Sequence, residues 1–173
     1  MDPFATLGIP RSYAVDLPAL EKTHRELSRA LHPDRYVDAG ASERRAALGK
    51  AVEVNEAWRI VRDPIRRADA LLALGGVPTG EEARSTASPE FLMEMLEQRE
   101  ALAEAKQARD LPAVRRMAAT VEARSAETER ALGEGFARAG AADLAALAGK
   151  VAELRFYRRF LDEVSAIEDE LAA

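Results

Sequence analysis

The chain has 173 residues, which is room for one domain of ordinary size or two small ones, and 47% of them are hydrophobic, enough for a packed core. The absence of cysteine excludes disulfides, thiolate metal sites and cysteine nucleophiles. No segment has the roughly 20 apolar residues of a bilayer span and the first residues lack signal-peptide features, so we expect a cytoplasmic protein with no membrane partner.

The two halves of the chain differ in charge. Residues 1–75 carry 12 Lys and Arg against 11 Asp and Glu, whereas residues 76–173 carry 13 against 19. Phosphate binding draws mainly on clustered Lys and Arg, so the acidic second half argues against a nucleic-acid partner. We expect the two halves to prefer different partners.

The first elements in chain order are a short helical turn and a long helix. Phe4 and Leu7 lie one helical step apart and predict a single turn of helix. A longer amphipathic helix is predicted from Leu17 to Leu31, with Asp16 as its N-cap. Its apolar face, at three- and four-residue spacing, comprises Leu17, Leu20, His24, Leu27 and Leu31.

This long helix stops at a His-Pro-Asp tripeptide. Pro33 cannot donate a backbone hydrogen bond and pushes His32 out of the helical region. We therefore expect His32 and Asp34 to be presented on a stiff connection between two helices. Residues 36–41 read as loop, with Ser42 as the next N-cap.

Two further helices complete the first half of the chain. Residues 42–62 predict a helix antiparallel to the first, with apolar positions Leu48, Ala51, Val54, Trp58 and Val61. Asp63-Pro64 starts another, which ends at Gly75-Gly76 and has buried positions Ile65, Ala68, Leu71, Leu72 and Leu74. Trp58 is interpreted as a packing residue rather than a recognition residue.

Residues 76–88 have linker character, being rich in glycine and hydroxyl residues with little periodicity. Three helical segments follow, opened by Ser88-Pro89, by Asp110, and by Gly140 with Asp143. The last carries a predicted bundle seam of Leu147, Leu154, Tyr157, Leu161, Val164 and Leu171. No stretch alternates like a strand, so the expected fold class is all-α.

The helix after Ser88 is apolar on two faces. One face holds Phe91, Met95, Gln98, Leu102 and Ala105, and the other holds Leu92, Met93, Leu96, Glu97, Glu100 and Glu104. The first can pack in the bundle and leave the second as a docking patch. Periodicity alone also allows Leu92, Met93 and Leu96 to face a neighbouring helix, and the glutamates to form an ordinary solvated face.

Several motifs carry a resemblance to a known family. Phe4-x-x-Leu7-Gly8-Ile9, His32-Pro33-Asp34-Arg35 and Val54-Asn55-Glu56-Ala57-Trp58 before Asp63-Pro64 together resemble a J-domain, the module by which DnaJ-type co-chaperones engage DnaK-class ATPases. The order of Arg67-Ala68-x-x-Leu71-Leu72, then Phe91-Leu92-Met93-Glu94-x-Leu96-Glu97, then Leu154-Arg155-Phe156 resembles the HscB family of iron-sulfur cluster assembly, in its bacterial type. The likeness covers nearly the whole chain.

The resemblance implies a J-domain helical hairpin at 1–75, a linker at 76–88 and a three-helix scaffold-binding domain at 89–173. It implies stimulation of a DnaK-class chaperone of the HscA type and delivery of an iron-sulfur scaffold protein of the IscU type. The chaperone-binding residues would be His32, Pro33, Asp34, Arg35, Lys22, Arg25 and Arg29. The scaffold-binding residues would be Leu92, Met93, Leu96, Glu97, Glu100, Glu104 and Phe156.

Some features depart from the general J-domain pattern. Glu21 and Glu26 interrupt the basic helix face, and His24 stands where DnaJ proteins commonly have tyrosine, which favours a dedicated partner. Two alternatives stay open: a J-domain protein that delivers another client, and a helical adaptor with no effect on an ATPase.

Enzyme chemistry is not expected. Ser28, His32 and Asp34 are triad residue types, but Pro33 breaks their geometry and no glycine-rich nest offers an oxyanion hole. His24 and His32 would lie roughly 12 Å apart along a helix, too far to share a metal ion. The chain has no phosphate loop or dinucleotide fingerprint, so we expect no catalytic residue, metal or cofactor.

Overall fold

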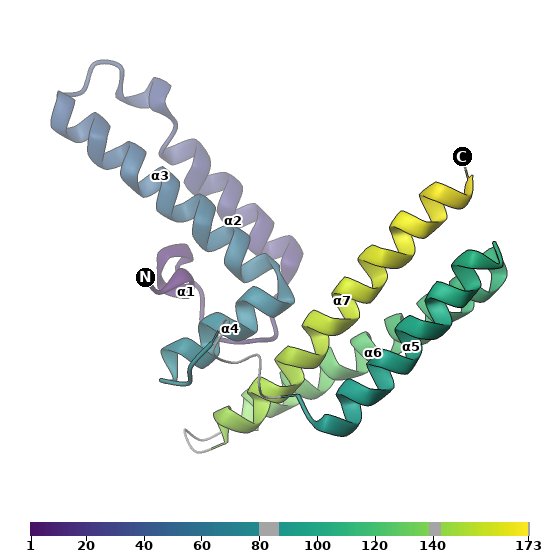
Figure 1. Cartoon of the computed structure of the whole chain (residues 1–173). Coiled ribbons are helices and arrows are strands. Elements are labelled where there is room, and N and C mark those ends of the chain that lie inside the picture. Colours follow the sequence, from purple (N-terminus) through teal and green to yellow (C-terminus); the bar gives the residue numbers. More distant parts are fainter. Residues whose placement is uncertain (80–86, 139–142, 173) are drawn as a thin grey trace. The chain divides into compact units, whose positions relative to one another are not determined.

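The computed structural model describes residues 1–79, 87–138 and 143–172, and every regular element in those ranges is a helix (Figure 1). The expected all-α class is confirmed. The chain divides into two compact units, Met1–Gly76 and Val77–Ala173. Of the expected linker, residues 80–86 lie outside the described ranges. The functional assignment of 1–75 and 89–173 stays a prediction.

The first unit contains four α-helices and one 3₁₀ helix. They are α1 (Pro3–Leu7), α2 (Leu17–Ala30), η1 (Pro33–Tyr36), α3 (Ala41–Arg62) and α4 (Pro64–Leu74). Asp16 caps α2 as predicted, its Oδ1 accepting from the Ala19 amide at 3.1 Å. Ser42 does not cap α3, because the helix already begins at Ala41 and Gly40 is the N-cap residue.

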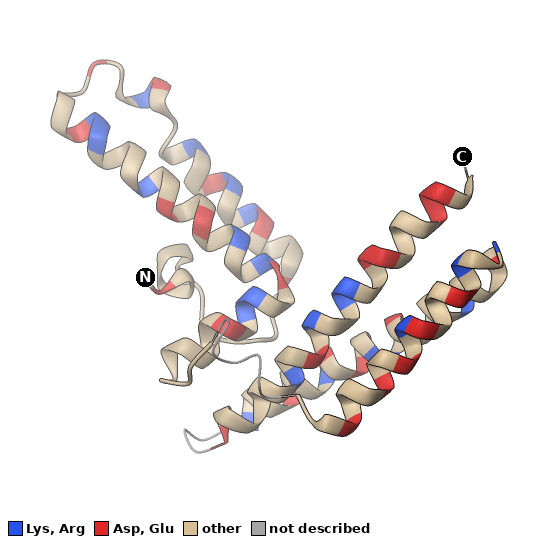
Figure 2. Ribbon diagram, viewed as in Figure 1, with Lys and Arg blue, Asp and Glu red and all other residues tan. Residues whose placement is uncertain are grey.

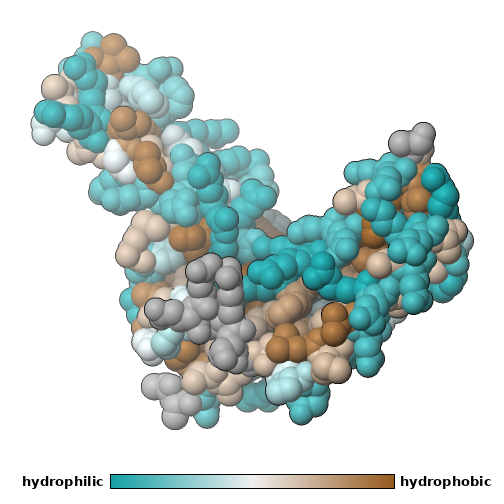
Figure 3. All heavy atoms as spheres, viewed as in Figure 1, coloured by the Kyte–Doolittle hydropathy of each residue, from teal (hydrophilic) through white to brown (hydrophobic). Residues whose placement is uncertain are grey.

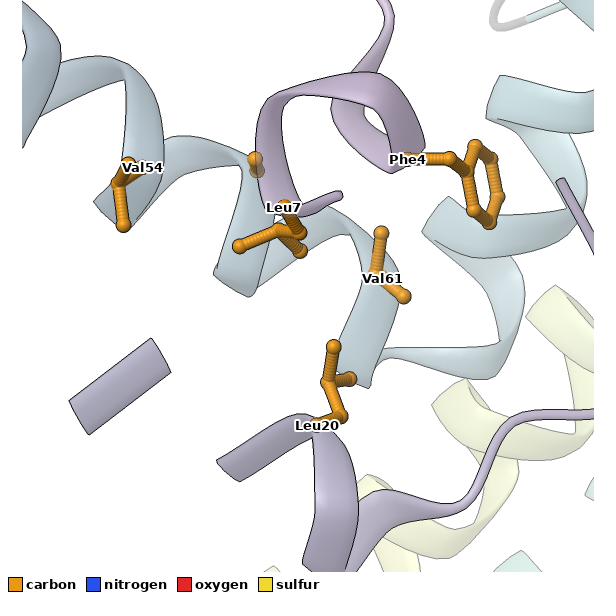
Figure 4. Close-up of a cluster of buried hydrophobic side chains, with 6 residues drawn as sticks. Phe4, Leu7, Leu20, Val54 and Val61 are labelled. Carbon is orange, nitrogen blue, oxygen red and sulfur yellow. The ribbon is translucent and has the colours of Figure 1, made fainter. Parts of the chain in front are cut away.

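The core of the first unit lies where α1 and α2 pack on α3. Figure 4 shows side chains from these three helices directed toward one another, and the buried cluster comprises Phe4, Leu7, Leu20, Val54, Ala57 and Val61. Leu17, Leu48 and Leu74 were expected to be buried but are exposed. In α3 the buried seam begins at Ala47, four residues before Ala51, which leaves Leu48 on the solvent side.

A buried arginine spans the break between α3 and α4. Arg67 is 7% exposed, donates from Nη1 to the Val61 carbonyl at 2.8 Å, and lies 4.7 Å from the centre of the Tyr13 ring. Pro64 cannot continue the α3 hydrogen-bond ladder, and the Ile65 amide donates to Asp63 instead. Arg67 therefore supplies the donor that the Val61 carbonyl loses at the helix end.

The described part of the second unit is a three-helix arrangement of α5 (Pro89–Gln107), α6 (Leu111–Arg138) and α7 (Leu144–Ala172). Ser88 and Asp110 cap α5 and α6 as predicted, accepting from the amides of Phe91 and Ala113. Asp143 directly precedes α7; Gly140, named with it as a start signal, lies outside the described residues.

The seam of α7 differs from the prediction near its C-terminal end. Leu147, Leu154, Tyr157 and Val164 are buried as expected. Leu161 and Leu171 are only half-buried, and Phe160 and Ile167 take the core positions. The buried positions 160, 164 and 167 keep the four- and three-residue spacing of a helical seam, with Val164 common to the predicted and the observed seam.

No helix in the described part of the chain is both long and apolar enough to cross a membrane.

Candidate functional site

The His-Pro-Asp turn, residues 32–36, is a short 3₁₀ helix with an exposed surface. His32 is its N-cap, and its Nδ1 accepts from the Asp34 amide at 3.3 Å. The same nitrogen lies 3.5 Å from Asp34 Oδ2, and the two side chains are 58% and 86% exposed. Residues 36–41 were expected to be loop, but Tyr36 instead completes the 3₁₀ turn that Pro33 begins.

Two hydrogen bonds attach this turn to the helices on either side. The Tyr36 hydroxyl donates back to the Ala30 carbonyl at the end of α2, at 3.3 Å. Arg44 of α3 donates to the Val37 carbonyl just after the turn, at 3.2 Å. The turn is thus exposed to a partner while its backbone is fixed at both ends.

The predicted chaperone-binding cations are exposed on the surface of the first unit. Lys22, Arg25 and Arg29 follow one another along α2 at three- and four-residue spacing, on one side of the helix. Neither they nor Arg35 forms an ion pair within residues 1–79, 87–138 and 143–172, although Glu21 and Glu26 are nearby in sequence. Figure 2 shows the alternation of basic and acidic positions along α2. These cations are therefore available to an acidic partner.

His24 packs between α2 and α3 instead of joining the His-Pro-Asp turn. Its ring stacks on Trp58 at 4.8 Å between centroids and 12° between planes, and Nε2 lies 3.0 Å from Asn55 Oδ1. Trp58 is half-buried against the core, in accord with its interpretation as a packing residue. The Ser28 hydroxyl, one of the three triad residue types, lies 3.3 Å from the same His24 nitrogen.

The α5 outer face, composed of Leu92, Met93, Leu96, Glu97, Glu100 and Glu104, is exposed along its whole length. Its apolar members Leu92, Met93 and Leu96 are 41%, 59% and 53% exposed, so the alternative in which they face a neighbouring helix is wrong. The opposite side of α5 buries Met95, Leu102 and Ala105. Figure 3 shows hydrophobic and hydrophilic spheres side by side over the N-terminal half of α5.

The three glutamates of the α5 outer face have no cationic partner among the described residues. None forms an ion pair within the described part of the chain. By contrast, Glu94 on the inner flank of α5 pairs with Arg124 of α6. The face therefore combines an apolar surface with uncompensated negative charge.

Phe156 of α7 lies at the edge of α5. Its half-buried ring meets Phe91 edge-on, with centroids 5.7 Å apart and planes at 70°. Phe91 also meets Tyr157 edge-on at 5.6 Å. Further along both helices, Arg99 of α5 pairs with Glu163 of α7 at 3.2 Å. These contacts bring Phe156 alongside α5, where the sequence alone could not place it.

The described residues contain no group of three or more His, Asp or Glu side chains arranged to hold a metal ion.

Comparisons with known proteins agree with this architecture. A family model described as the HSCB C-terminal oligomerisation domain matches residues 87–165. Over 98% of its length the chain is 38% identical to a co-chaperone protein HscB homolog of Cupriavidus taiwanensis, covering 95% of that protein. The chain belongs to the HscB co-chaperone family. A second HscB homolog, from Mannheimia succiniciproducens, is 31% identical over 99% of the chain and 98% of the relative.

Solved HscB structures share the fold. Chaperone HscB from Vibrio cholerae superposes with a TM-score of 0.86 at 29% identity over 99% of both chains. Human co-chaperone protein HscB gives 0.85 at 23% identity, over 96% of this chain and 81% of that one, which shows the fold alone. The HscB homologs of Cupriavidus taiwanensis and Mannheimia succiniciproducens are named co-chaperone proteins, and this chain is a co-chaperone of the same family.

The sequence of this HscB-family chain did not predict two residues near the His-Pro-Asp turn and the α5 outer face. Arg44 fixes the backbone after the His-Pro-Asp turn, and Arg159 lies 6.0 Å over the Phe156 ring. Neither contact has a signal in apolar periodicity, because both depend on the side-chain direction of an exposed arginine. The Arg159 contact has the helical i,i+3 spacing from Phe156, which is the one hint available from sequence.

Because of Tyr157, we expect the folding stability of this HscB-family chain to depend on pH in the alkaline range. Burial raises the pKa of Tyr157 above its ordinary value of 10.0, and the nearby Glu153 carboxylate raises it further, outweighing Arg124 and the bond to Thr128. The neutral phenol is thus favoured by folding. Its contribution to stability is complete below about pH 10 and is lost as pH rises from there through the raised folded pKa.

Denaturant unfolding from about pH 8 to pH 11.5 should show this loss as a falling midpoint. Tyr157→Phe should flatten the part of the decline that begins near pH 10, and Tyr36→Phe, at a half-exposed tyrosine, serves as the matched control. An identical alkaline decline in wild type and Tyr157→Phe would show that Tyr157 does not cause it.

Proposed function

We propose that this chain binds an iron-sulfur scaffold protein of the IscU type and delivers it to a DnaK-class chaperone of the HscA type in the cytoplasm. It stimulates the ATPase of that chaperone and so promotes iron-sulfur cluster assembly and transfer. The first unit engages the chaperone and the second carries the scaffold protein. ATP hydrolysis belongs to the chaperone, and this chain supplies contacts only.

Support for the chaperone contact comes from the His-Pro-Asp turn and its surroundings. His32 and Asp34 are exposed on a backbone that Tyr36 and Arg44 fix at both ends. A ligand shifts a two-state partner only through contacts that favour one state, and a fixed exposed turn is suited to such a contact. The uncompensated cations of α2 add attraction to an acidic surface, which mainly speeds association.

The observation that carries the scaffold-binding proposal is the two-sided character of α5. Its inner side is packed in the bundle, while Leu92, Met93 and Leu96 stay exposed beside three uncompensated carboxylates. Burial of exposed leucine and methionine side chains by a partner contributes about 1.5–3 kcal/mol for each one fully buried. A partner with an apolar patch ringed by Lys or Arg fits this face.

The test is steady-state ATP hydrolysis by the chaperone, with this chain and the scaffold protein added separately and together. Stimulation by both that exceeds the sum of the separate effects supports the complete proposal. Stimulation by this chain that ignores the scaffold protein would keep the chaperone contact and point to another client. No stimulation with any DnaK-class partner would leave only a structural adaptor.

A further inference from the structure

Arg159 of α7 is an exposed cation at the edge of the α5 outer face. Phe156 and Glu163 of α7 both contact α5 side chains, Phe91 and Arg99 respectively. Arg159 is three residues after the first and four before the second, so it shares their side of the helix. Figure 2 shows basic positions near the middle of α7 and acidic positions along α5.

Both cations of α5 form ion pairs with carboxylates of α7, whereas Arg159 of α7 forms none within the described residues. Arg99 pairs with Glu163 at 3.2 Å, and Lys106 pairs with Glu170 at 2.7 Å. Arg159 has no carboxylate within ion-pair distance in the described part of the chain; its only recorded partner is the Phe156 ring, 6.0 Å from the guanidinium carbon. A guanidinium over an aromatic face keeps its five N–H donors available at the ring edge.

The α5 outer face and the adjoining Phe156 edge therefore carry negative and positive side chains that form no ion pair within the described residues. Glu97, Glu100 and Glu104 supply negative charge along α5, and Arg159 supplies positive charge at the Phe156 edge. Complementary charge fixes the register of a docked partner and excludes partners with the wrong pattern. A uniformly basic partner would meet repulsion at Arg159.

We infer that Arg159 is a specificity-determining residue of the scaffold-binding face, where it donates to a carboxylate of the scaffold protein beside that protein's apolar anchor. This inference rests on the proposed scaffold-binding function and adds the chemistry of the partner. The scaffold surface then has basic side chains opposite the glutamates of α5 and an Asp or Glu opposite Arg159. Arg159 also lies over the Phe156 ring, and Phe91 of α5 meets the same ring edge-on.

The experiment measures the Kd of the full chain for an IscU-type scaffold protein by calorimetry, at two salt concentrations. Arg159→Gln removes the charge, and Arg159→Glu reverses it. We expect about tenfold weaker binding for the first and a distinctly larger loss for the second, with the difference shrinking at high salt. Arg116→Glu, an exposed arginine of α6 without an ion pair in the described residues, is the matched control and should change Kd less than about twofold.

The sign of the Arg159→Glu effect decides the question. If the scaffold surface were uniformly basic, the added negative charge would tighten binding, and that outcome would overturn the inference. Equal losses for Gln and Glu would mean that Arg159 acts only by holding Phe156, which also overturns the carboxylate contact. Restoration of Arg159→Glu binding by one Asp or Glu to Lys change on the scaffold protein would identify the partner residue.

Failure of the proposed function gives a different result. If the wild-type chain does not bind the scaffold protein at all, the scaffold-binding proposal and this inference both fall. Wild-type binding with no change in any Arg159 variant overturns this inference alone. Because Arg159 is exposed, unchanged thermal unfolding of the variants is expected and confirms that binding, not folding, is being compared.

Discussion

We expect His32→Gln to lower the stimulation of the chaperone ATPase by about tenfold or more and to leave scaffold binding unchanged. His32 is 58% exposed and belongs to the first unit, so its replacement creates no cavity and does not touch α5. Its Nδ1 caps the η1 turn by accepting from the Asp34 amide. Single-turnover ATP hydrolysis, with and without this chain, measures the loss directly.

A second substitution separates the cap from the contact. His32→Asn keeps a side-chain acceptor of the kind favoured at N-caps, but it removes the imidazole. If the chaperone reads the imidazole, both variants lose stimulation. Full stimulation by His32→Asn would show that His32 acts only by shaping the turn, and full stimulation by His32→Gln would remove the turn from the mechanism.

We expect Leu92→Ala combined with Leu96→Ala to weaken scaffold binding by about 100-fold and to spare ATPase stimulation by the chain in isolation. Each leucine that a partner buries contributes about 1.5–3 kcal/mol, and central apolar side chains commonly dominate an interface. In the free chain Leu92 and Leu96 are 41% and 53% exposed, so their truncation leaves little or no cavity in the bundle. Calorimetric titration with the scaffold protein gives the change in Kd.

Leu48→Ala is the matched control for this double variant. Leu48 is a comparably exposed leucine, at 59%, on α3 of the other unit. It should leave the Kd for the scaffold protein unchanged. Equal weakening by both variants, or loss of ATPase stimulation by the α5 variant alone, would contradict the division of labour between the two units.

Much of the fold follows from local signals. Asp16, Asp63, Ser88 and Asp110 each cap the helix that the sequence predicts, because an N-cap acts within three residues of itself. The errors concern which of two adjacent residues is buried. Ala47 and Phe160 take core positions expected for Leu48 and Leu161, since an apolar face wide enough for both is resolved only by the partner helix.

Less of the candidate site than of the fold could be predicted from local signals. Helical geometry alone separated the two faces of α5, and the structure shows which one packs. Helical geometry alone could not show that Phe156 meets Phe91, because that contact joins residues 65 positions apart. The roles of both surfaces come from the family likeness and stay predictions until binding is measured. Arg44 and Arg159 depend on tertiary contacts of exposed side chains and had no such likeness to reveal them.

The bond from Arg67 to the Val61 carbonyl has a consequence for how the first unit opens. A sharp break between helices is commonly a weak point, where backbone amides exchange with solvent early. Here α4 cannot separate from the end of α3 without breaking this buried hydrogen bond and the contact of Arg67 with the Tyr13 ring. The amides of α4 and of the C-terminal half of α3 should therefore exchange with deuterium in one cooperative opening. We therefore expect the change of chain direction at residue 63 not to act as a hinge.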